Sequence, residues 1–433
     1  MKKLSKYQSE ALKQMISHKH FCLFFSMRMR KTIICIRYLK ITSFFPVLIV
    51  VPFSAMYEWK EQLHDDHLFN INVISENRNK KIRKQMLQKD AGIYLMNHEA
   101  YRSVPEIGKM FFKCMIFDEI HILSNPKSAI SKFYNHNFRS VEHRIGLTGT
   151  WLSKSEFDIF QIIHFLDHSY TFPYKNYWQC RFALCTQERF DWVLKPQGKK
   201  YFGNLLIDHC SVKDYLDVGI KDTLNEVFRF VKLDNQVRKQ YRDLLKTFIL
   251  EDEKVQKSTI FATVNYIWIR QLLSGFVEDR LLNRAKINEL NYLLNTEFKF
   301  QKVVIWGFFD NEIYEVSKLL KCSFVNGKIK KSDAIQNIKS FQEGNQKRIV
   351  INCRRTEGMK LSSADAEIYL TIPESPIKRS QSKRRIFDID QKQIKTCIYL
   401  ITENTIEEGI LKSIKYNTNC KQEILNYINR VKL

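Results

Sequence analysis

Short apolar runs, separated by longer stretches with helical periodicity, recur along the first 150 residues. Runs this short and this apolar predict strands that are buried on both faces. Strands that alternate regularly with helices indicate an α/β fold with a parallel, doubly wound sheet. The runs lie at Phe21–Phe25, Pro46–Pro52, Ile93–Met96, Cys114–Phe117 and His143–Leu147.

The pattern changes twice further along the chain. From about residue 152 to 290 it becomes helical, and we expect a helical insertion there. Short apolar runs then return and predict a second parallel sheet. These runs lie at Lys302–Gly307, Ser323–Gly327, Arg348–Asn352, Ala366–Leu370 and Thr396–Ile401.

The sequence therefore predicts two parallel-sheet α/β domains in tandem. We place the first domain over residues 1–225, including the start of the insertion. The rest of the helical insertion and a linker follow over 226–290, and the second domain occupies 291–433. A chain of 433 residues exceeds the size at which one hydrophobic core keeps growing, which agrees with two domains.

The run Cys114–Phe117 ends at two adjacent carboxylates, Asp118 and Glu119. The carboxyl ends of parallel strands form the edge at which open α/β sheets bind their ligands. We therefore interpret the two acids as a functional pair. The alternative is that Asp118 caps a following helix and that Glu119 is solvated.

The segment after Phe21–Phe25 has the layout of a phosphate-binding loop. A strand, a loop that ends in Lys-Thr and an apolar helix follow one another, so Lys31 would reach the β- and γ-phosphates and the Thr32 hydroxyl would bind Mg²⁺. The glycines that normally let backbone amides wrap a phosphate are absent. Arg28 and Arg30 stand in their places.

The charge of the chain points to a polyanionic partner. Lys and Arg number 70 against 46 Asp and Glu, so the formal net charge is +24. An excess of this size is typical of proteins that bind nucleic acid.

Cysteine usage and apolar run length indicate the compartment. The ten cysteines lack the paired spacings of a disulfide framework, and no charged-then-apolar leader opens the chain. We expect a reducing, cytoplasmic location in a bacterium or a virus-infected cell. No run approaches the length of a membrane span, so we expect no membrane partner. The spacing of Cys180, Cys185, His209 and Cys210 is not a standard zinc spacing.

Taken in order, these pieces resemble the superfamily-two helicases, and within them the Swi/Snf-type double-stranded DNA translocases, especially the compact ones carried by phages. The resemblance extends from Tyr7-Gln8 to Thr405-Ile406-Glu407-Glu408. It implies two RecA-like domains, ATP as the nucleotide, Mg²⁺ as the cofactor and hydrolysis coupled to movement along nucleic acid, most of all duplex DNA. Single short motifs are weak signals, but their correct order is specific.

The resemblance also implies roles in the first domain. Gln8 looks like the glutamine that reads adenine, although a surface glutamine is the commoner explanation. Lys31 and Thr32 look like the end of the Walker A motif, and residues 118–121 look like a DExH box. In that box Asp118 would hold Mg²⁺ through water, and Glu119 would orient and deprotonate the attacking water.

Further residues are implied in the second domain and on the nucleic-acid path. Gly358 would contribute to the nucleotide site, and Gln381 and Arg385 would contribute to catalysis. The side chains expected to contact nucleic acid are Pro52, Phe53, Ser54, Trp59, Asn97, Thr148, Thr150, Asn326, Arg354, Arg355 and Thr356.

Two positions depart from the family pattern. Arg30 replaces a glycine before the Walker A lysine, and its side chain and restricted φ would crowd the phosphate. Asp388 replaces the arginine finger, which is worth roughly 10³ to 10⁵ in rate in related NTPases. Three explanations stay open: Arg384 substitutes by a shift of one residue, a partner supplies the finger, or hydrolysis is slow or lost.

We therefore expect an ATP-dependent helicase or translocase that acts in the replication or recombination of phage or mobile-element DNA, with a replication or recombination protein as a further partner. The rival interpretation is a helicase-shaped DNA-binding scaffold or loader with weakened catalysis. Arg30 and Asp388 favour the rival. The intact Lys31, Asp118 and Glu119 favour the motor.

Overall fold

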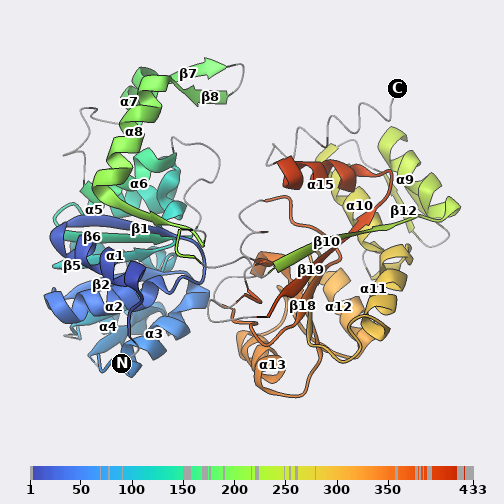
Figure 1. Ribbon diagram of the computed structural model, residues 1–433, viewed down its shortest axis with the longest axis horizontal. Coiled ribbons are helices and arrows are strands. Elements are labelled where there is room, and N and C mark those ends of the chain that lie inside the picture. The colour runs from blue at the N-terminus through green and yellow to red at the C-terminus, as the bar shows by residue number, and fades with distance from the viewer. Residues whose placement is uncertain are drawn as a thin grey trace. The chain divides into compact units, whose positions relative to one another are not determined.

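Parallel sheets organise both halves of the chain. The computed structural model divides into two units, Met1–Asp222 and Thr223–Leu433, and each unit is built around one sheet (Figure 1). The structure describes residues 3–433 except 69, 77–78, 90, 150–157, 168–173, 175–176, 189–190, 216, 220–223, 248, 253–254, 259–261, 278, 356–358, 376–378, 380–381, 384, 388–392, 417–423 and 425–433. The predicted fold class, α/β with two parallel sheets, is confirmed.

The sheet of the first unit has seven parallel strands in the order β3-β4-β2-β5-β6-β1-β9. All five strands predicted for this half are present. The strands are β1 (His20–Phe25), β2 (Val47–Val51), β3 (Ile71–Val73), β4 (Ile93–Asn97), β5 (Cys114–Asp118), β6 (His143–Thr148) and β9 (Cys210–Lys213).

Along the chain, helices alternate with the strands of this sheet. They are α1 (Lys6–Ser17), α2 (Lys31–Thr42), α3 (Met56–Asp65), α4 (Lys80–Leu87), α5 (Ala129–Asn137), α6 (Asp158–Asp167), α7 (Tyr177–Leu184) and α8 (Pro196–His209). A short antiparallel hairpin, β7 (Cys185–Glu188) and β8 (Asp191–Leu194), follows α7 and lies away from the sheet (Figure 1).

Alternate residues of the central strands pack on one face of this sheet. Leu48 and Val50 of β2 and Met115 and Phe117 of β5 form one core with side chains from α5 and α6. The residues between them, such as Ile49 and Ile116, are also fully buried. Both faces of β2 and β5 are thus covered, which explains why these strands are continuous apolar runs.

The sheet of the second unit has six parallel strands in the order β10-β19-β18-β15-β17-β16. Its strands are β10 (Leu224–Val231), β15 (Val303–Gly307), β16 (Ser323–Val325), β17 (Arg348–Asn352), β18 (Ala366–Tyr369) and β19 (Lys395–Thr402). Its helices are α9 (Asn235–Thr247), α10 (Ala262–Ser274), α11 (Ala285–Asn295), α12 (Asp310–Leu320), α13 (Lys331–Glu343) and α15 (Ile406–Tyr416). Two antiparallel hairpins complete the unit: β11 (Ile249–Asp252) with β12 (Val255–Ser258), and β13 (Phe276–Val277) with β14 (Arg280–Leu281).

Strand β15 shows how this second sheet is covered on both sides. Val304 and Trp306 face a core that includes α9, α10 and α15. Val303 and Ile305 face the opposite core with α11 and α12. The five strands predicted for this half are present.

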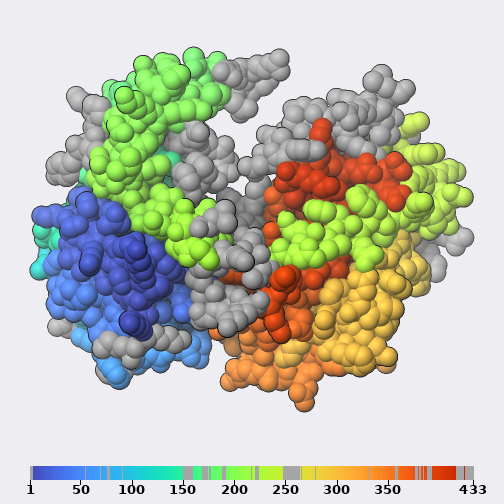
Figure 2. Space-filling view, in the orientation of Figure 1, coloured from blue at the N-terminus to red at the C-terminus, as the bar shows by residue number. Residues whose placement is uncertain are grey.

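The helical pattern expected over residues 152–290 is incomplete, because two strands of the main sheets lie in this range. Strand β9 pairs in parallel with β1, and β10 pairs along its whole length with β19. Figure 2 shows the second pairing at the surface, where the yellow-green segment at the start of the second unit borders the red segment near its end. Both strands are at the edges of their sheets, where one side of the strand is not covered by a neighbour.

No described helix combines the length and apolar character needed to cross a membrane. All cysteines in the described part of the chain are free thiols. Within the same residues, no group of three or more His, Cys, Asp or Glu side chains is arranged to hold a metal ion.

A buried carboxyl group lies inside the second sheet. Glu367 of β18 is fully buried, and its Oε2 accepts a hydrogen bond from the indole Nε1 of Trp306 at 2.8 Å. Burial raises the pKa of Glu367 from 4.5 to about 8, and the Trp306 bond offsets only part of this rise. The acid is therefore protonated near neutral pH in the folded protein.

We expect stability to fall as the pH rises from about 5 to about 8. In this window the folded protein binds a proton at Glu367 that the unfolded chain has released. The free energy of unfolding therefore falls by at most about 1.4 kcal/mol per pH unit. Glu367→Gln should flatten this slope, and Glu343→Gln on the exposed side of α13 should keep it. Chemical denaturation across this pH range, followed by a spectroscopic signal from the second unit, measures the slope for both variants. An unchanged slope in Glu367→Gln would show that this carboxyl group is not the cause.

Candidate functional site

The loop between β1 and α2 adopts left-handed backbone conformations at both arginines. Arg28 has φ 66°, and Arg30 has φ 55° and ψ 47°. Glycine adopts this region freely, whereas it costs an ordinary residue about 1–2 kcal/mol. Such conformations persist in non-glycine residues mainly at functional sites. The loop thus has the backbone shape that glycine would allow, although the sequence supplies arginine.

Neighbouring elements hold this loop in place. The backbone N–H of Ser26 donates to the carbonyl of Lys213 at 3.0 Å, and the buried Tyr215 hydroxyl donates to the carbonyl of Met27. From α1, the Tyr7 hydroxyl donates to the carbonyl of Met29 at 3.2 Å. Strand β9 and the residues after it, which the sequence did not reveal as part of the site, therefore support the loop.

Lys31 is the first residue of α2 and reaches back into the loop. Its Nζ donates to the carbonyl of Phe25 at 2.9 Å and to that of Ser26 at 3.4 Å. Burial lowers the pKa of Lys31, and the nearby carboxylates of Glu119 and Asp118 oppose that shift. The amine is thus close enough to the two acids for their charges to interact.

Asp118 is held at the carboxyl end of β5 by two donors. The indole Nε1 of Trp59 donates to its Oδ2 at 3.0 Å, and the backbone N–H of Glu119 donates to its Oδ1 at 3.0 Å. Burial, together with the adjacent Glu119 carboxylate, raises the pKa of Asp118. A positive charge close to Asp118 would lower this pKa again and favour the carboxylate, which is the form that binds a metal.

Glu119 belongs to a triangle of polar side chains. The Thr148 hydroxyl at the end of β6 donates to Glu119 Oε2 at 3.3 Å. His121 Nδ1 lies 3.2 Å from the same carboxylate oxygen and 3.1 Å from the Thr148 oxygen. Glu119 has φ 50°, again a left-handed conformation at a strand end. The triangle links the end of β5 to the end of β6.

The arrangement fits Mg²⁺ better than a metal that needs a protein cage. Mg²⁺ commonly takes one or two protein oxygens and completes its shell with water and substrate phosphates. Asp118 offers a carboxylate at the strand end, and Thr32, the second residue of α2, offers a hydroxyl. The two residues that we predicted as metal ligands are thus of the right chemical kind.

In the second unit, one carboxylate connects the ends of three strands. Asp310, which follows β15, accepts at Oδ1 from the backbone N–H of Gly327 at 3.0 Å and from Asn352 Nδ2 at 2.8 Å. Asn326 donates to the Asp310 carbonyl at 3.3 Å. The sequence did not single out Asp310 or Asn352, although Asp310 opens the helix that follows one predicted strand and Asn352 ends another.

Three arginines predicted to act in this unit have partners in the structure. The Arg354 guanidinium lies over the Phe308 ring, 3.8 Å from its centroid, and Arg355 Nη2 donates to the Gly327 carbonyl at 3.4 Å. Arg385 Nη1 donates to the carbonyl of Met359 at 3.4 Å. Residues 359 and 385 belong to different predicted motifs, and the fold brings them together.

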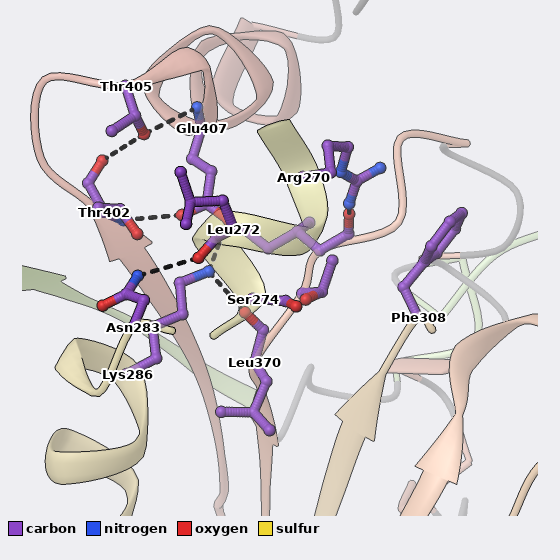
Figure 3. Close-up of polar contacts among 12 residues, drawn as sticks. Arg270, Leu272, Ser274, Asn283, Lys286, Phe308, Leu370, Thr402, Thr405 and Glu407 are labelled. Carbon is purple, nitrogen blue, oxygen red and sulfur yellow. Dashed lines mark hydrogen bonds and ion pairs between the residues drawn. The ribbon is translucent and has the colours of Figure 1, made fainter. Parts of the chain in front are cut away.

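A buried ion pair lies at the carboxyl ends of β18 and β19 (Figure 3). Lys286 Nζ of α11 contacts Glu407 Oε1 of α15 at 2.5 Å and donates to the Leu370 carbonyl at 2.6 Å. The other oxygen of Glu407 accepts from the backbone N–H of Thr402 at 2.8 Å. The side chains of Lys286 and Glu407 are 1% and 5% exposed, so water cannot solvate either charge if the pair is broken. The buried Arg270 of α10 lies nearby and pairs with Glu374.

The residues predicted to contact nucleic acid fall into two groups. Trp59, Thr148 and Asn326 have side chains only 1%, 0% and 3% exposed. They reach a nucleic acid only if the chain rearranges. Phe53, Arg354 and Arg355 are exposed.

The remaining predicted residues have less specific surroundings. Pro52 is buried, and Asn97 accepts a hydrogen bond from the Ser75 hydroxyl at 2.6 Å. Gln8 is 6% exposed, and its Oε1 accepts from the backbone N–H of Ser5 at 2.9 Å. Thr150, Thr356, Gly358, Gln381, Arg384 and Asp388 and the side chain of Ser54 lie outside the described residues.

Arg30→Gly should stabilise the first unit by about 0.5–1 kcal/mol, because glycine removes the left-handed strain at the start of α2. Lys13→Gly, at an exposed position inside α1, should instead destabilise it by about 0.5–1 kcal/mol. Thermal unfolding of the two variants measures the difference. If both glycines destabilise equally, Arg30 is not strained in solution.

Fold and site together define an α/β protein of two sheet units, with Lys31 at the start of the helix after β1 and an Asp-Glu pair at the carboxyl end of β5 in its first sheet. A family model, SNF2-related domain, matches residues 3–281. The chain belongs to this family.

Similar proteins share much of the chain at low identity. The mouse chromodomain-helicase-DNA-binding protein 6 is 22% identical over 448 residues, which is 89% of this chain and 16% of that protein. The ISWI chromatin-remodeling complex ATPase ISW1 of Saccharomyces cerevisiae is 22% identical over 90% of this chain and 36% of its own length. This chain therefore spans only a minor part of these relatives.

A solved structure of the Sulfolobus solfataricus SWI2/SNF2 ATPase core in complex with dsDNA can be superposed with a TM-score of 0.46. Its sequence is 19% identical, and the match covers 96% of this chain and 91% of that one.

Proposed function

We propose that this chain is an ATP-driven motor that translocates along double-stranded DNA or remodels it. The observation that carries the proposal is the cluster of Lys31, Asp118 and Glu119 at the carboxyl edge of the first sheet, in a chain that belongs to the SNF2-related family. A cation at a helix start and two acids at a strand end are the groups that phosphoryl transfer requires.

Each residue of the cluster has a distinct task. Lys31 would leave its carbonyl partners and pair with the β- and γ-phosphates of ATP. Asp118 and Thr32 would hold Mg²⁺, which when bound neutralises charge that develops on the phosphate oxygens. Glu119 would orient the attacking water and accept its proton.

The contacts of Glu119 support a link between hydrolysis and movement. Its carboxylate is held by His121 and by Thr148 at the end of the neighbouring strand. A change in its hydrogen bonding during hydrolysis would therefore alter the end of β6, close to predicted nucleic-acid contacts. Thr148 thus acts in our proposal through Glu119 and not by touching DNA.

The charge of the chain supports nucleic acid as the track. The net charge of +24 favours contacts with phosphates, which position a protein without reading base sequence. Exposed Arg354 and Arg355 are of the chemical kind that makes such contacts. The names of two relatives, with "DNA-binding" and "chromatin-remodeling", agree with this choice.

The rival function, a DNA-binding scaffold with weakened catalysis, is favoured by one observation. Arg28 and Arg30 place large cationic side chains on a loop whose backbone would suit glycine. The scaffold would bind duplex DNA without turning over ATP. The finer hypothesis of a role in phage or mobile-element replication or recombination rests on the resemblance of the sequence alone.

Steady-state ATP hydrolysis with duplex DNA, single-stranded DNA or RNA tests the proposed track. We expect the duplex to stimulate turnover most, and its half-saturating concentration to rise steeply with salt because phosphate contacts release counterions. ATP-dependent displacement of a third strand from a DNA triplex then tests movement. Stimulation by RNA alone, or DNA binding with no turnover, would contradict the proposal.

A further inference from the structure

The sequence predicts Trp59 on the nucleic-acid path, but the structure places it inside the first unit. It lies in the first half of α3 with its side chain 1% exposed, and its indole N–H donates to Asp118 Oδ2 at 3.0 Å. The other oxygen of Asp118 is held by the backbone N–H of Glu119. A carboxylate oxygen accepts more than one hydrogen bond, so both oxygens still have capacity for water or a metal. Trp59 therefore fixes the orientation of the carboxylate without blocking it.

The C-terminal end of helix α3 contacts the C-terminal half of helix α2. Asp66, at the end of α3, pairs with Arg37 of α2 at 3.1 Å, and Lys40 of α2 donates to the Asp66 carbonyl at 2.7 Å. Helix α2 begins at Lys31. One short helix is thus joined at its start to the metal-binding acid and at its end to the helix of the phosphate-binding loop.

The outer surface of the same segment faces solvent. Phe53, in the short helical turn Phe53–Ala55 before α3, is 41% exposed, and Tyr57 in the first turn of α3 is 72% exposed. Exposed apolar side chains that lie close together mark a surface that contacts a partner. A ligand that shifts this surface moves the helix that carries Trp59.

We propose that Trp59 is a positioning residue that holds Asp118 for Mg²⁺ and couples the exposed surface of Phe53 and Tyr57 to the metal site. The inference rests on the proposed function, and it adds a residue through which DNA acts on metal binding. Removal of a side chain that orients a metal ligand typically lowers metal affinity by about 10–100-fold. Coupling between two sites is reciprocal, so metal must also strengthen DNA binding by the same factor.

The variant Trp59→Phe removes the indole N–H and keeps an aromatic ring. A matched control is Trp306→Phe in the second unit, which also removes an indole donor from a buried carboxyl group, here Glu367 at 2.8 Å. Mn²⁺ binding in the presence of ADP is measured by electron paramagnetic resonance, with and without duplex DNA. DNA affinity is measured by fluorescence anisotropy with and without Mn²⁺ and ADP.

We expect Trp59→Phe to bind Mn²⁺ at least about 10-fold more weakly than wild type, whereas Trp306→Phe binds it normally. Duplex DNA should strengthen Mn²⁺ binding to wild type and lose this effect in Trp59→Phe. Circular dichroism of both variants shows which fraction is folded, and Mn²⁺ bound per folded molecule is compared. If Trp59→Phe only unfolded part of the protein, Mn²⁺ bound per folded molecule would stay at the wild-type value.

Three outcomes overturn the inference in different ways. If Trp59→Phe binds Mn²⁺ like wild type, Trp59 does not position Asp118. If it binds Mn²⁺ weakly but DNA still strengthens binding by the wild-type factor, the coupling is wrong. If wild type binds no Mn²⁺ with ADP, the proposed function itself fails together with the inference.

Discussion

Glu119→Gln should lose DNA-stimulated ATP hydrolysis by a factor of about 10²–10⁴, which is the usual contribution of a general base. Glutamine has nearly the same shape and still accepts a hydrogen bond from the Thr148 hydroxyl, but it does not take a proton from water. Nucleotide binding should persist, because Lys31 and Asp118 are unchanged. Single-turnover hydrolysis and binding of a fluorescent ATP analogue separate the two effects.

The control for this variant is Glu99→Gln. Glu99 forms an exposed ion pair with Arg102 at 3.0 Å, and such a pair contributes little, so turnover by Glu99→Gln should match wild type. If Glu119→Gln hydrolyses ATP at more than about a tenth of the wild-type rate, another group activates the water, and the role given to Glu119 is wrong.

Lys286→Met should destabilise the second unit by about 3–5 kcal/mol. The substitution leaves the Glu407 carboxylate buried without its cation and removes a donor from the Leu370 carbonyl. An uncompensated buried charge is far more costly than the loss of a surface pair. Denaturant unfolding, followed by a spectroscopic signal from the second unit, measures the change in the free energy of unfolding.

Two variants test whether charge is the cause. Lys286→Met combined with Glu407→Gln should recover most of the loss, because glutamine has no charge and still accepts from the Thr402 N–H. Lys318→Met breaks an exposed pair with Glu315 at 3.2 Å and should cost no more than about 1 kcal/mol. If the double variant is no more stable than Lys286→Met, lost packing and not the buried charge causes the destabilisation.

The strands that carry the site could be predicted from the sequence because they are buried on both faces. Runs such as Val47–Val51 and Cys114–Phe117 are continuous and apolar, and the acids at their ends mark the ligand edge. Strands β9 and β10 could not be predicted in this way. They are edge strands that contain polar residues, and their periodicity does not distinguish them from a helical segment.

The role of Trp59 could not be predicted for a different reason. The sequence places Trp59 on a helix after a strand, but its partner Asp118 is 59 positions away and lies on a neighbouring strand. Only the packing of α3 against the sheet edge decides whether the indole faces solvent or the acid. The left-handed φ of Arg28 and Arg30 is similar, because it depends on contacts from β9 and α1 that no local pattern encodes.

The most direct test of the motor is steady-state hydrolysis of Mg·ATP with duplex DNA by wild type and by Lys31→Ala. Removal of one charge that stabilises the transition state typically costs about 10²–10³ in rate. We therefore expect wild type to exceed Lys31→Ala by at least about 10². Equal turnover by the two proteins would contradict the proposal that Lys31, Asp118 and Glu119 form an ATP-hydrolysing site.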